Sequence, residues 1–181
     1  GMDAGIAFDG DADRCICVDS KGNVIDGDFI MAICAQDMKE RGKLYKNSVV
    51  GTIMTNMGFE KFARENSITT QTTKVGDRFV LEKMLLEGIN LGGEQSGHII
   101  FRDFATTGDG ELTAIQLLSL VKRSGKKLSE LSKIMTKYPQ VSINVKVSND
   151  GKVKFYTNNT VKEAIENAKQ KLSDKGRIVV K

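Results

Sequence analysis

The sequence has little of several residue types that mark particular protein classes. It contains no tryptophan, one proline and one histidine, and aromatic residues make up 6% of the chain. No apolar run approaches the roughly 18 residues that a membrane-spanning helix needs, and the N-terminus lacks the basic and apolar regions of a secretory signal. We therefore expect a soluble, cytoplasmic protein that does not bind a membrane.

The scarcity of histidine and cysteine argues against a zinc site. Cys15, Cys17 and Cys34 are odd in number, and their spacing does not match a zinc knuckle. We expect three reduced thiols with a structural role.

The charge pattern argues against a nucleic-acid partner. The net charge is +4, but the lysines are scattered along the chain. Proteins that bind nucleic acid usually concentrate positive charge on one surface and combine it with aromatic side chains, which are few here.

Hydrophobic periodicity predicts an α/β fold. Short apolar runs at 5–8 and 15–18 predict two strands around an acidic turn, and helical spacing predicts a helix over 28–41 with Asp26 or Asp28 as its N-cap. The strands expected next, at 48–53, 69–74, 90–93 and 98–101, alternate with helices around 59–65 and 79–87. This alternation is typical of a mixed, largely parallel sheet with flanking helices.

Three loops follow strands of this predicted sheet. They are residues 55–56, 74–78 and 94–98. Because loops that leave the carboxyl ends of parallel strands line up along one edge, we expect the three to share one rim where a ligand binds.

The C-terminal third of the chain has a different pattern. After helices expected around 112–118 and 128–135, the only proline, in Tyr138-Pro139, predicts a boundary. Strands are then expected at 141–147, 153–156 and 177–180, with a helix over 161–172. We predict the end of one domain at 1–25, an α/β domain at 26–137, and a truncated, loosely folded α+β domain at 138–181.

The acidic turn has the sequence Asp-Gly-Asp-Ala-Asp-Arg at residues 9–14. Carboxylates this close repel one another unless a hard cation binds them, and oxygen-only ligands favour magnesium or calcium. A calcium EF-hand would need glycine and glutamate where this chain has Arg14 and Ser20. We therefore take Asp9, Asp11 and Asp13 as candidate Mg²⁺ ligands, with Arg14 as a candidate partner for a phosphate oxygen.

Other interpretations of the acidic turn stay open. A solvated turn without a metal is the simplest of them. A haloacid-dehalogenase phosphatase uses the first aspartate of a similar run as nucleophile, but it usually carries Thr or Val where this chain has Asp13. A topoisomerase-primase metal site would call for the nucleic-acid features that are weak here.

A second cluster occupies residues 92–98, Gly-Gly-Glu-Gln-Ser-Gly-His. Glu94 and Ser96 are two residues apart, so in an extended backbone they face the same side and could hold adjacent sugar hydroxyls. Taken alone, His98 is more typical of a structural histidine. Lys74, followed by Val-Gly-Asp-Arg, could equally mark the start of a helix.

In combination, these motifs and their order resemble the α-D-phosphohexomutase superfamily over essentially the whole chain. The resemblance implies the fold of that superfamily's third domain, with Mg²⁺ bound by Asp9, Asp11 and Asp13 and with Arg14 beside the phosphoryl group. It also implies that Glu94 and Ser96 contact the sugar hydroxyls, that His98 lies close to the substrate, and that Lys74 is a general acid/base. Val-Gly-Asp-Arg at 75–78 and Thr-Thr-Gly-Asp-Gly at 106–110 resemble the phosphoglucosamine branch.

For a complete enzyme, the resemblance implies a phosphoserine that donates its phosphoryl group to glucosamine 6-phosphate. The glucosamine 1,6-bisphosphate intermediate then reorients and returns the other phosphate, which yields glucosamine 1-phosphate for UDP-N-acetylglucosamine and peptidoglycan synthesis. The family's serine loop and its last phosphate-binding loop are not found in this sequence, so we expect the 181 residues alone to be inactive.

Two further functions stay open at this point. One is a phosphomannomutase/phosphoglucomutase, and the other is a non-catalytic module that binds a metal and a sugar phosphate. The expected partner is a phosphosugar, and the oligomeric state is left open, with a homodimer as one option.

Overall fold

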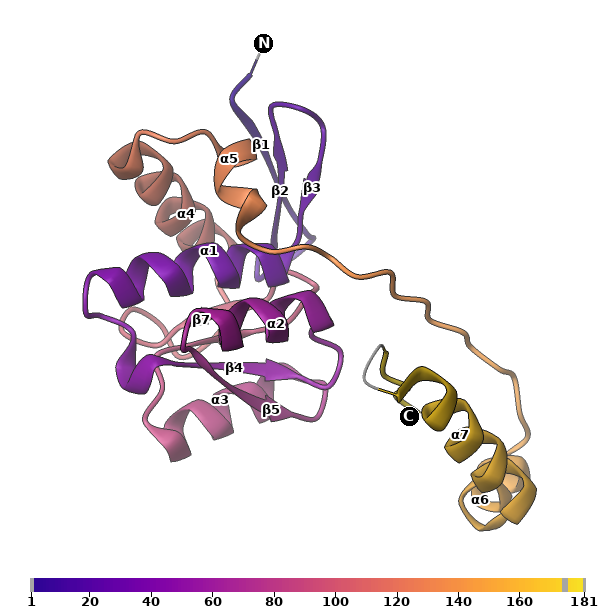
Figure 1. The fold of residues 1–181 in the computed structure, drawn as a ribbon. Coiled ribbons are helices and arrows are strands. Elements are labelled where there is room, and N and C mark those ends of the chain that lie inside the picture. Colours follow the sequence, from indigo (N-terminus) through magenta and orange to yellow (C-terminus); the bar gives the residue numbers. More distant parts are fainter. Residues whose placement is uncertain (1, 174–175, 181) are drawn as a thin grey trace. The chain divides into compact units, whose positions relative to one another are not determined.

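A computed structural model describes residues 2–173 and 176–180, and the chain divides into two compact units, Gly1–Tyr138 and Pro139–Lys181. The strands, shown with the helices in Figure 1, are β1 (Ala4–Phe8), β2 (Cys15–Asp19), β3 (Val24–Ile25), β4 (Ser48–Thr52), β5 (Thr69–Thr73), β6 (Leu91–Gly93) and β7 (Ile99–Phe101). The α-helices are α1 (Gly27–Glu40), α2 (Met57–Glu65), α3 (Asp77–Glu87), α4 (Gly110–Ser124), α5 (Leu128–Leu131), α6 (Asn149–Thr157) and α7 (Asn159–Leu172). Short 3₁₀ turns lie at Tyr45–Asn47 and Ser132–Ile134.

The first unit contains two sheets. β1, β2 and β3 form an antiparallel meander, in which Phe8 pairs with Cys15 beside the acidic turn. The second sheet has the order β5-β4-β6-β7, with β5 and β6 parallel to β4 and β7 antiparallel to β6. The predicted mixed, largely parallel sheet is therefore confirmed.

Helices cover both faces of the second sheet. Val49 belongs to the larger apolar core, which includes residues of α1, α2 and α4, whereas Val50 packs with Val80 and Met84 of α3. Successive residues of a strand point to opposite faces, so this alternation places α1 and α2 on one side of β4 and α3 on the other. Figure 1 shows the same layering.

Helix α1 begins and ends at residues suited to those positions. The Asp26 carboxylate caps the helix by accepting hydrogen bonds from the backbone N–H groups of Asp28 and Phe29. After Glu40 the chain leaves the helix through Gly42, whose φ of +65° is readily adopted by glycine. Of the two N-caps considered from the sequence, Asp26 is therefore correct, and Asp28 lies inside the first turn.

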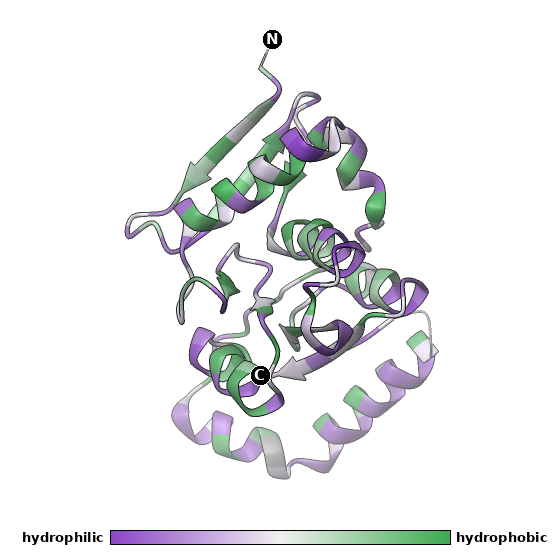
Figure 2. Cartoon of the chain, turned by 90° about the vertical axis from the view of Figure 1, so that its left-hand side faces the viewer, coloured by the Kyte–Doolittle hydropathy of each residue, from purple (hydrophilic) through white to green (hydrophobic). Residues whose placement is uncertain are grey.

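In the second unit, helix α7 is confirmed but the predicted strands are wrong. Residues 141–147 form neither strand nor helix, residues 153–156 lie within α6, and residues 177–180 form no strand. A strand needs a hydrogen-bonding partner, and the β-branched side chains Val141, Ile143 and Val145 are more than 70% exposed, so their alternation marks no buried face. Ser148 instead caps α6, and Figure 2 shows α6 and α7 as largely hydrophilic helices.

The structure also bears on domain limits and membrane spans. Residues 1–25 belong to the same compact unit as the sheet, so a domain boundary after residue 25 stays a prediction. Among residues 2–173 and 176–180, no helix is long and apolar enough to cross a membrane.

Candidate functional site

The acidic turn lies where the β1–β2 hairpin reverses direction. Its backbone is closed by a hydrogen bond from the Ala12 N–H to the Asp9 carbonyl at 3.3 Å, and Ala12 has a φ of +59°. This tight path brings the carboxylates of Asp9, Asp11 and Asp13 together, with one oxygen from each within 4.8 Å of the others.

The carboxylates of the turn lie near the side chains of Arg14 and His98. The Arg14 guanidinium lies 3.6 Å from Asp9 and 3.7 Å from Asp13, and Nε2 of His98 lies 3.6 Å from Oδ2 of Asp13. Burial raises the pKa of Asp13, and the negative charges of Asp11 and Asp9 raise it further. The turn therefore carries more negative charge than its own cations balance.

The donor set fits a hard divalent cation. All three grouped side chains offer carboxylate oxygens, which magnesium and calcium prefer over nitrogen or sulfur ligands. In the part of the chain that the structure describes, Oδ1 of Asp13 is buried without a hydrogen-bond partner. A cation would satisfy this oxygen and offset the repulsion that raises the Asp13 pKa.

Loop 94–98, which joins β6 to β7, lies directly against the acidic turn. The Cys15 N–H donates to the Gly97 carbonyl at 3.1 Å, and Arg14 and His98 form an isolated antiparallel bridge. Gly97 has a φ of +94°, and a Cβ on it would lie 2.4 Å from the Cys15 carbonyl oxygen. The two motifs, which lie far apart in sequence at residues 9–14 and 94–98, therefore form one surface.

The segment before α4 completes this surface from a third direction. The Gly110 N–H donates to the Ala12 carbonyl at 2.8 Å, and a Cβ on Gly108 would lie 2.3 Å from Nε2 of His98. The His98 side chain is consequently only 4% exposed, although the backbone of its loop faces the acidic turn. Sequence reasoning used residues 106–110 only to choose a branch, yet the glycine spacing could have indicated this close backbone approach.

The loop after β5 approaches loop 94–98 from the sheet edge. The Gly76 N–H donates to Oε1 of Glu94 at 2.9 Å, which fixes the direction of that half-buried carboxylate. Lys74 lies at the end of β5 with an exposed side chain, and Ser96 is also exposed.

The predicted rim is present. Loop 94–98 contacts residues 74–78 through Gly76, and it is joined to Asn56 through Asp28, which accepts hydrogen bonds from Asn56 and Gln95. Sequence reasoning did not connect Asp28 with these loops, because in the sequence a carboxylate at the start of a helix looks like an ordinary capping residue.

Comparisons with known proteins show what the chain is similar to. The family model described as "Phosphoglucomutase/phosphomannomutase, alpha/beta/alpha domain III" matches residues 26–138. Proteins named phosphoglucosamine mutase from Caldanaerobacter subterraneus and Brevibacillus brevis are each 56% identical over 99% of this chain. The chain spans only 40% of the length of these curated relatives.

Solved structures show the same fold. A phosphoglucomutase/phosphomannomutase family protein from Burkholderia thailandensis matches 78% of this chain and 30% of its own, with 26% identity and a TM-score of 0.66. The N-acetylphosphoglucosamine mutase of Aspergillus fumigatus, solved with GlcNAc-6P and magnesium, matches 76% of this chain and 34% of its own, with a TM-score of 0.64. At 19% identity, the latter likeness concerns the fold alone.

Proposed function

The chain belongs to the phosphoglucomutase/phosphomannomutase family, and on that premise we propose that it is the C-terminal-side part of a phosphoglucosamine mutase. The complete enzyme would interconvert glucosamine 6-phosphate and glucosamine 1-phosphate through a phosphoserine and a glucosamine 1,6-bisphosphate intermediate, as a cytoplasmic isomerase. The observation that carries the proposal is the backbone pairing of the acidic turn with loop 94–98, because it brings the candidate metal-binding carboxylates next to the candidate sugar-binding residues Glu94 and Ser96.

The acidic turn is proposed to hold Mg²⁺ through Asp9, Asp11 and Asp13. When bound there, the ion would offset negative charge on a transferring phosphoryl group. The Arg14 guanidinium, half exposed beside the turn, can donate to a phosphate oxygen. The bound ion and Arg14 would together stabilise a doubly charged phosphate group next to the acidic turn.

Loop 94–98 is proposed to bind the sugar. Because Oε1 of Glu94 already accepts from Gly76, its other oxygen is oriented and available for a sugar hydroxyl, and the exposed Ser96 hydroxyl can bind a neighbouring one. His98, held between Asp13 and Gly108, would lie beside the substrate. Lys74 is proposed to move a proton to or from the reacting hydroxyl.

We propose that the 181 residues alone bind the phosphosugar without turning it over. The nucleophilic phosphoserine would belong to the part of the relatives that this chain does not span. A phosphomannomutase/phosphoglucomutase is the second candidate, favoured by the description of the matching family model and by the Burkholderia protein. No nucleic acid or membrane enters the proposal, and it leaves the oligomeric state open.

The test compares turnover of glucosamine, glucose and mannose monophosphates by the full-length protein that contains this chain, with magnesium present. Asp11→Asn should reduce turnover at least tenfold, because it removes one carboxylate from the site. Asp3→Asn is the matched control, since Asp3 is an exposed aspartate of the same N-terminal region outside the turn. If the protein prefers glucose or mannose monophosphate, the proposed glucosamine substrate is wrong. If it turns over none of the three sugar monophosphates, a non-catalytic binding module is favoured.

A further inference from the structure

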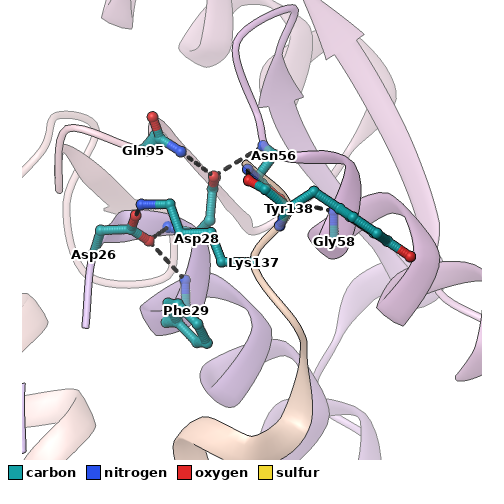
Figure 3. A network of polar contacts seen from close by, with 8 residues as sticks. All are labelled: Asp26, Asp28, Phe29, Asn56, Gly58, Gln95, Lys137 and Tyr138. Atoms are coloured by element: carbon teal, nitrogen blue, oxygen red, sulfur yellow. Dashed lines mark hydrogen bonds and ion pairs between the residues drawn. The ribbon is translucent and has the colours of Figure 1, made fainter. Parts of the chain in front are cut away.

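Asp28 is a fully buried carboxylate outside the groups proposed to bind metal or sugar. As Figure 3 shows, its Oδ2 accepts two hydrogen bonds, from the Asn56 N–H at 2.9 Å and from Nε2 of Gln95 at 3.0 Å. Its Oδ1 is buried without a hydrogen-bond partner among the residues that the structure describes. Burial of a carboxylate is unfavourable, so these two hydrogen bonds are what stabilises it there.

One of the two donors belongs to loop 94–98. Gln95 lies between Glu94 and Ser96, so its side-chain amide ties the middle of the loop to the first turn of α1. The Gly27 N–H also donates to the Gln95 carbonyl at 3.1 Å, and a Cβ on Gly27 would lie 2.0 Å from the Glu94 carbonyl oxygen. The start of α1 therefore contacts both the backbone of Glu94 and Gln95 and the side chain of Gln95.

The other donor connects Asp28 to the end of the first unit. The Asn56 side chain donates to the Tyr138 carbonyl at 2.9 Å and accepts from the Tyr138 N–H at 2.9 Å. Lys137 forms an ion pair with Asp26, the N-cap of the same helix. Three segments distant in sequence, at residues 26–28, 56 and 137–138, thus share one polar network with the loop.

We propose that Asp28 is a positioning residue, which fixes loop 94–98 in its substrate-binding form by accepting hydrogen bonds from Gln95 and Asn56. The inference rests on the proposed function for the loop's role in sugar binding. This role requires a hydrogen-bond acceptor at the Oδ2 position of residue 28, because the Asn56 N–H and the Gln95 side-chain amide both donate to that atom.

Three variants separate this role from general stabilisation. Asp28→Leu keeps a similar size but removes both acceptors. Asp28→Asn is the conservative variant, because its amide oxygen can take the Oδ2 position and accept the same two bonds. Asp19→Leu is the matched control: Asp19 is 4% exposed and accepts from Lys21 and Asn23 at the end of β2 opposite the acidic turn.

Two measurements are made on each variant. Amide hydrogen exchange of residues 94–98 is followed in the 181-residue chain, and kcat and KM for glucosamine 6-phosphate are measured in the full-length protein. We expect Asp28→Leu to accelerate exchange in the loop roughly tenfold or more and to raise KM by a similar factor, with a smaller effect on kcat. Asp28→Asn should stay within about threefold of the wild type in both, and Asp19→Leu should change neither.

The outcomes are separable. Unchanged loop exchange in Asp28→Leu, or equal damage from Asp28→Leu and Asp28→Asn, overturns the positioning role. If the wild-type enzyme does not turn over glucosamine phosphate, the proposed function fails, while the exchange data still decide the role of Asp28. If Asp28→Leu does not fold, Gln95→Met leaves Asp28 in place and removes the side-chain donor on the loop. Faster exchange of residues 94–98 in this variant supports the role of Asp28, and unchanged exchange overturns it.

Discussion

The stability of the first unit should depend on pH through Asp28. Burial is the largest cause that raises the pKa of the Asp28 carboxyl from 3.8 to about 6, and the negative charge of Asp26 also raises it. The hydrogen bonds from Asn56 and Gln95 and the charge of Lys137 lower this pKa, but they do not cancel the effect of burial. In the unfolded chain the same carboxyl titrates near its ordinary value. Between these values the folded protein keeps a proton that the unfolded chain has lost, so this group lowers the free energy of unfolding as pH rises.

The size of this effect follows from the two pKa values. The difference between 3.8 and about 6 corresponds to about 3 kcal/mol, lost progressively between them and constant above the higher one. Asp28→Asn cannot titrate. The free energy of unfolding of Asp28→Asn minus that of the wild type should therefore rise by about 3 kcal/mol as the pH increases from about 4 to about 7.

Urea unfolding of the first unit at several pH values provides the assay, with the variant always compared with the wild type so that the other titrating groups cancel. Asp19→Asn is the control with the opposite sign, because the side-chain hydrogen bond from Asn23 lowers the pKa of Asp19. The stabilisation that the Asp19 carboxylate contributes is fully present above its ordinary pKa, and it is lost as the pH falls through the lower pKa that Asp19 has in the folded protein. A difference between Asp28→Asn and wild type that does not vary with pH would refute the reasoning.

Three further outcomes are expected. Gly97→Ala should destabilise the first unit by about 1–3 kcal/mol in urea unfolding, because its φ is +94° and the new Cβ meets the Cys15 carbonyl, whereas Gly10→Ala, in open space, should cost less than about 0.5 kcal/mol. Phe59→Ala should cost about 3–5 kcal/mol by the same assay, since Phe59 is 0% exposed; a loss below about 1 kcal/mol would contradict its place in the core. Amides of residues 141–147 should exchange rapidly, because the segment forms no helix or strand, and protection equal to that of β4 would contradict this.

The secondary structure of the first unit could be predicted because the hydrophobic pattern of each segment favours the same element that packing in the folded unit requires. The helical stripe after Asp26 and the apolar runs before each loop correspond to α1 and to the strands, and strand order then brings the loops to one rim. The prediction of strands at 141–147 and 153–156 was wrong, because alternation of apolar and polar residues does not by itself supply a neighbouring strand to pair with. Asp28 could not be assigned from sequence, since its role depends on a contact with Gln95 that only the tertiary fold creates, and the glycine spacing at 106–110 could indicate a close backbone approach but not that His98 is the partner of Gly108.

The pairing of the acidic turn with loop 94–98 has a consequence for what the site can accept. The tie is made by main-chain groups, through the Cys15 N–H to the Gly97 carbonyl and the bridge between Arg14 and His98, and it needs glycine at position 97, where a Cβ would meet the Cys15 carbonyl. The separation between the carboxylates of the turn and the side chains of Glu94 and Ser96 is therefore set by the main chain rather than by contacts between those side chains. A ligand that contacts both loops at once must therefore match one separation between them, because neither loop can shift without breaking these main-chain hydrogen bonds.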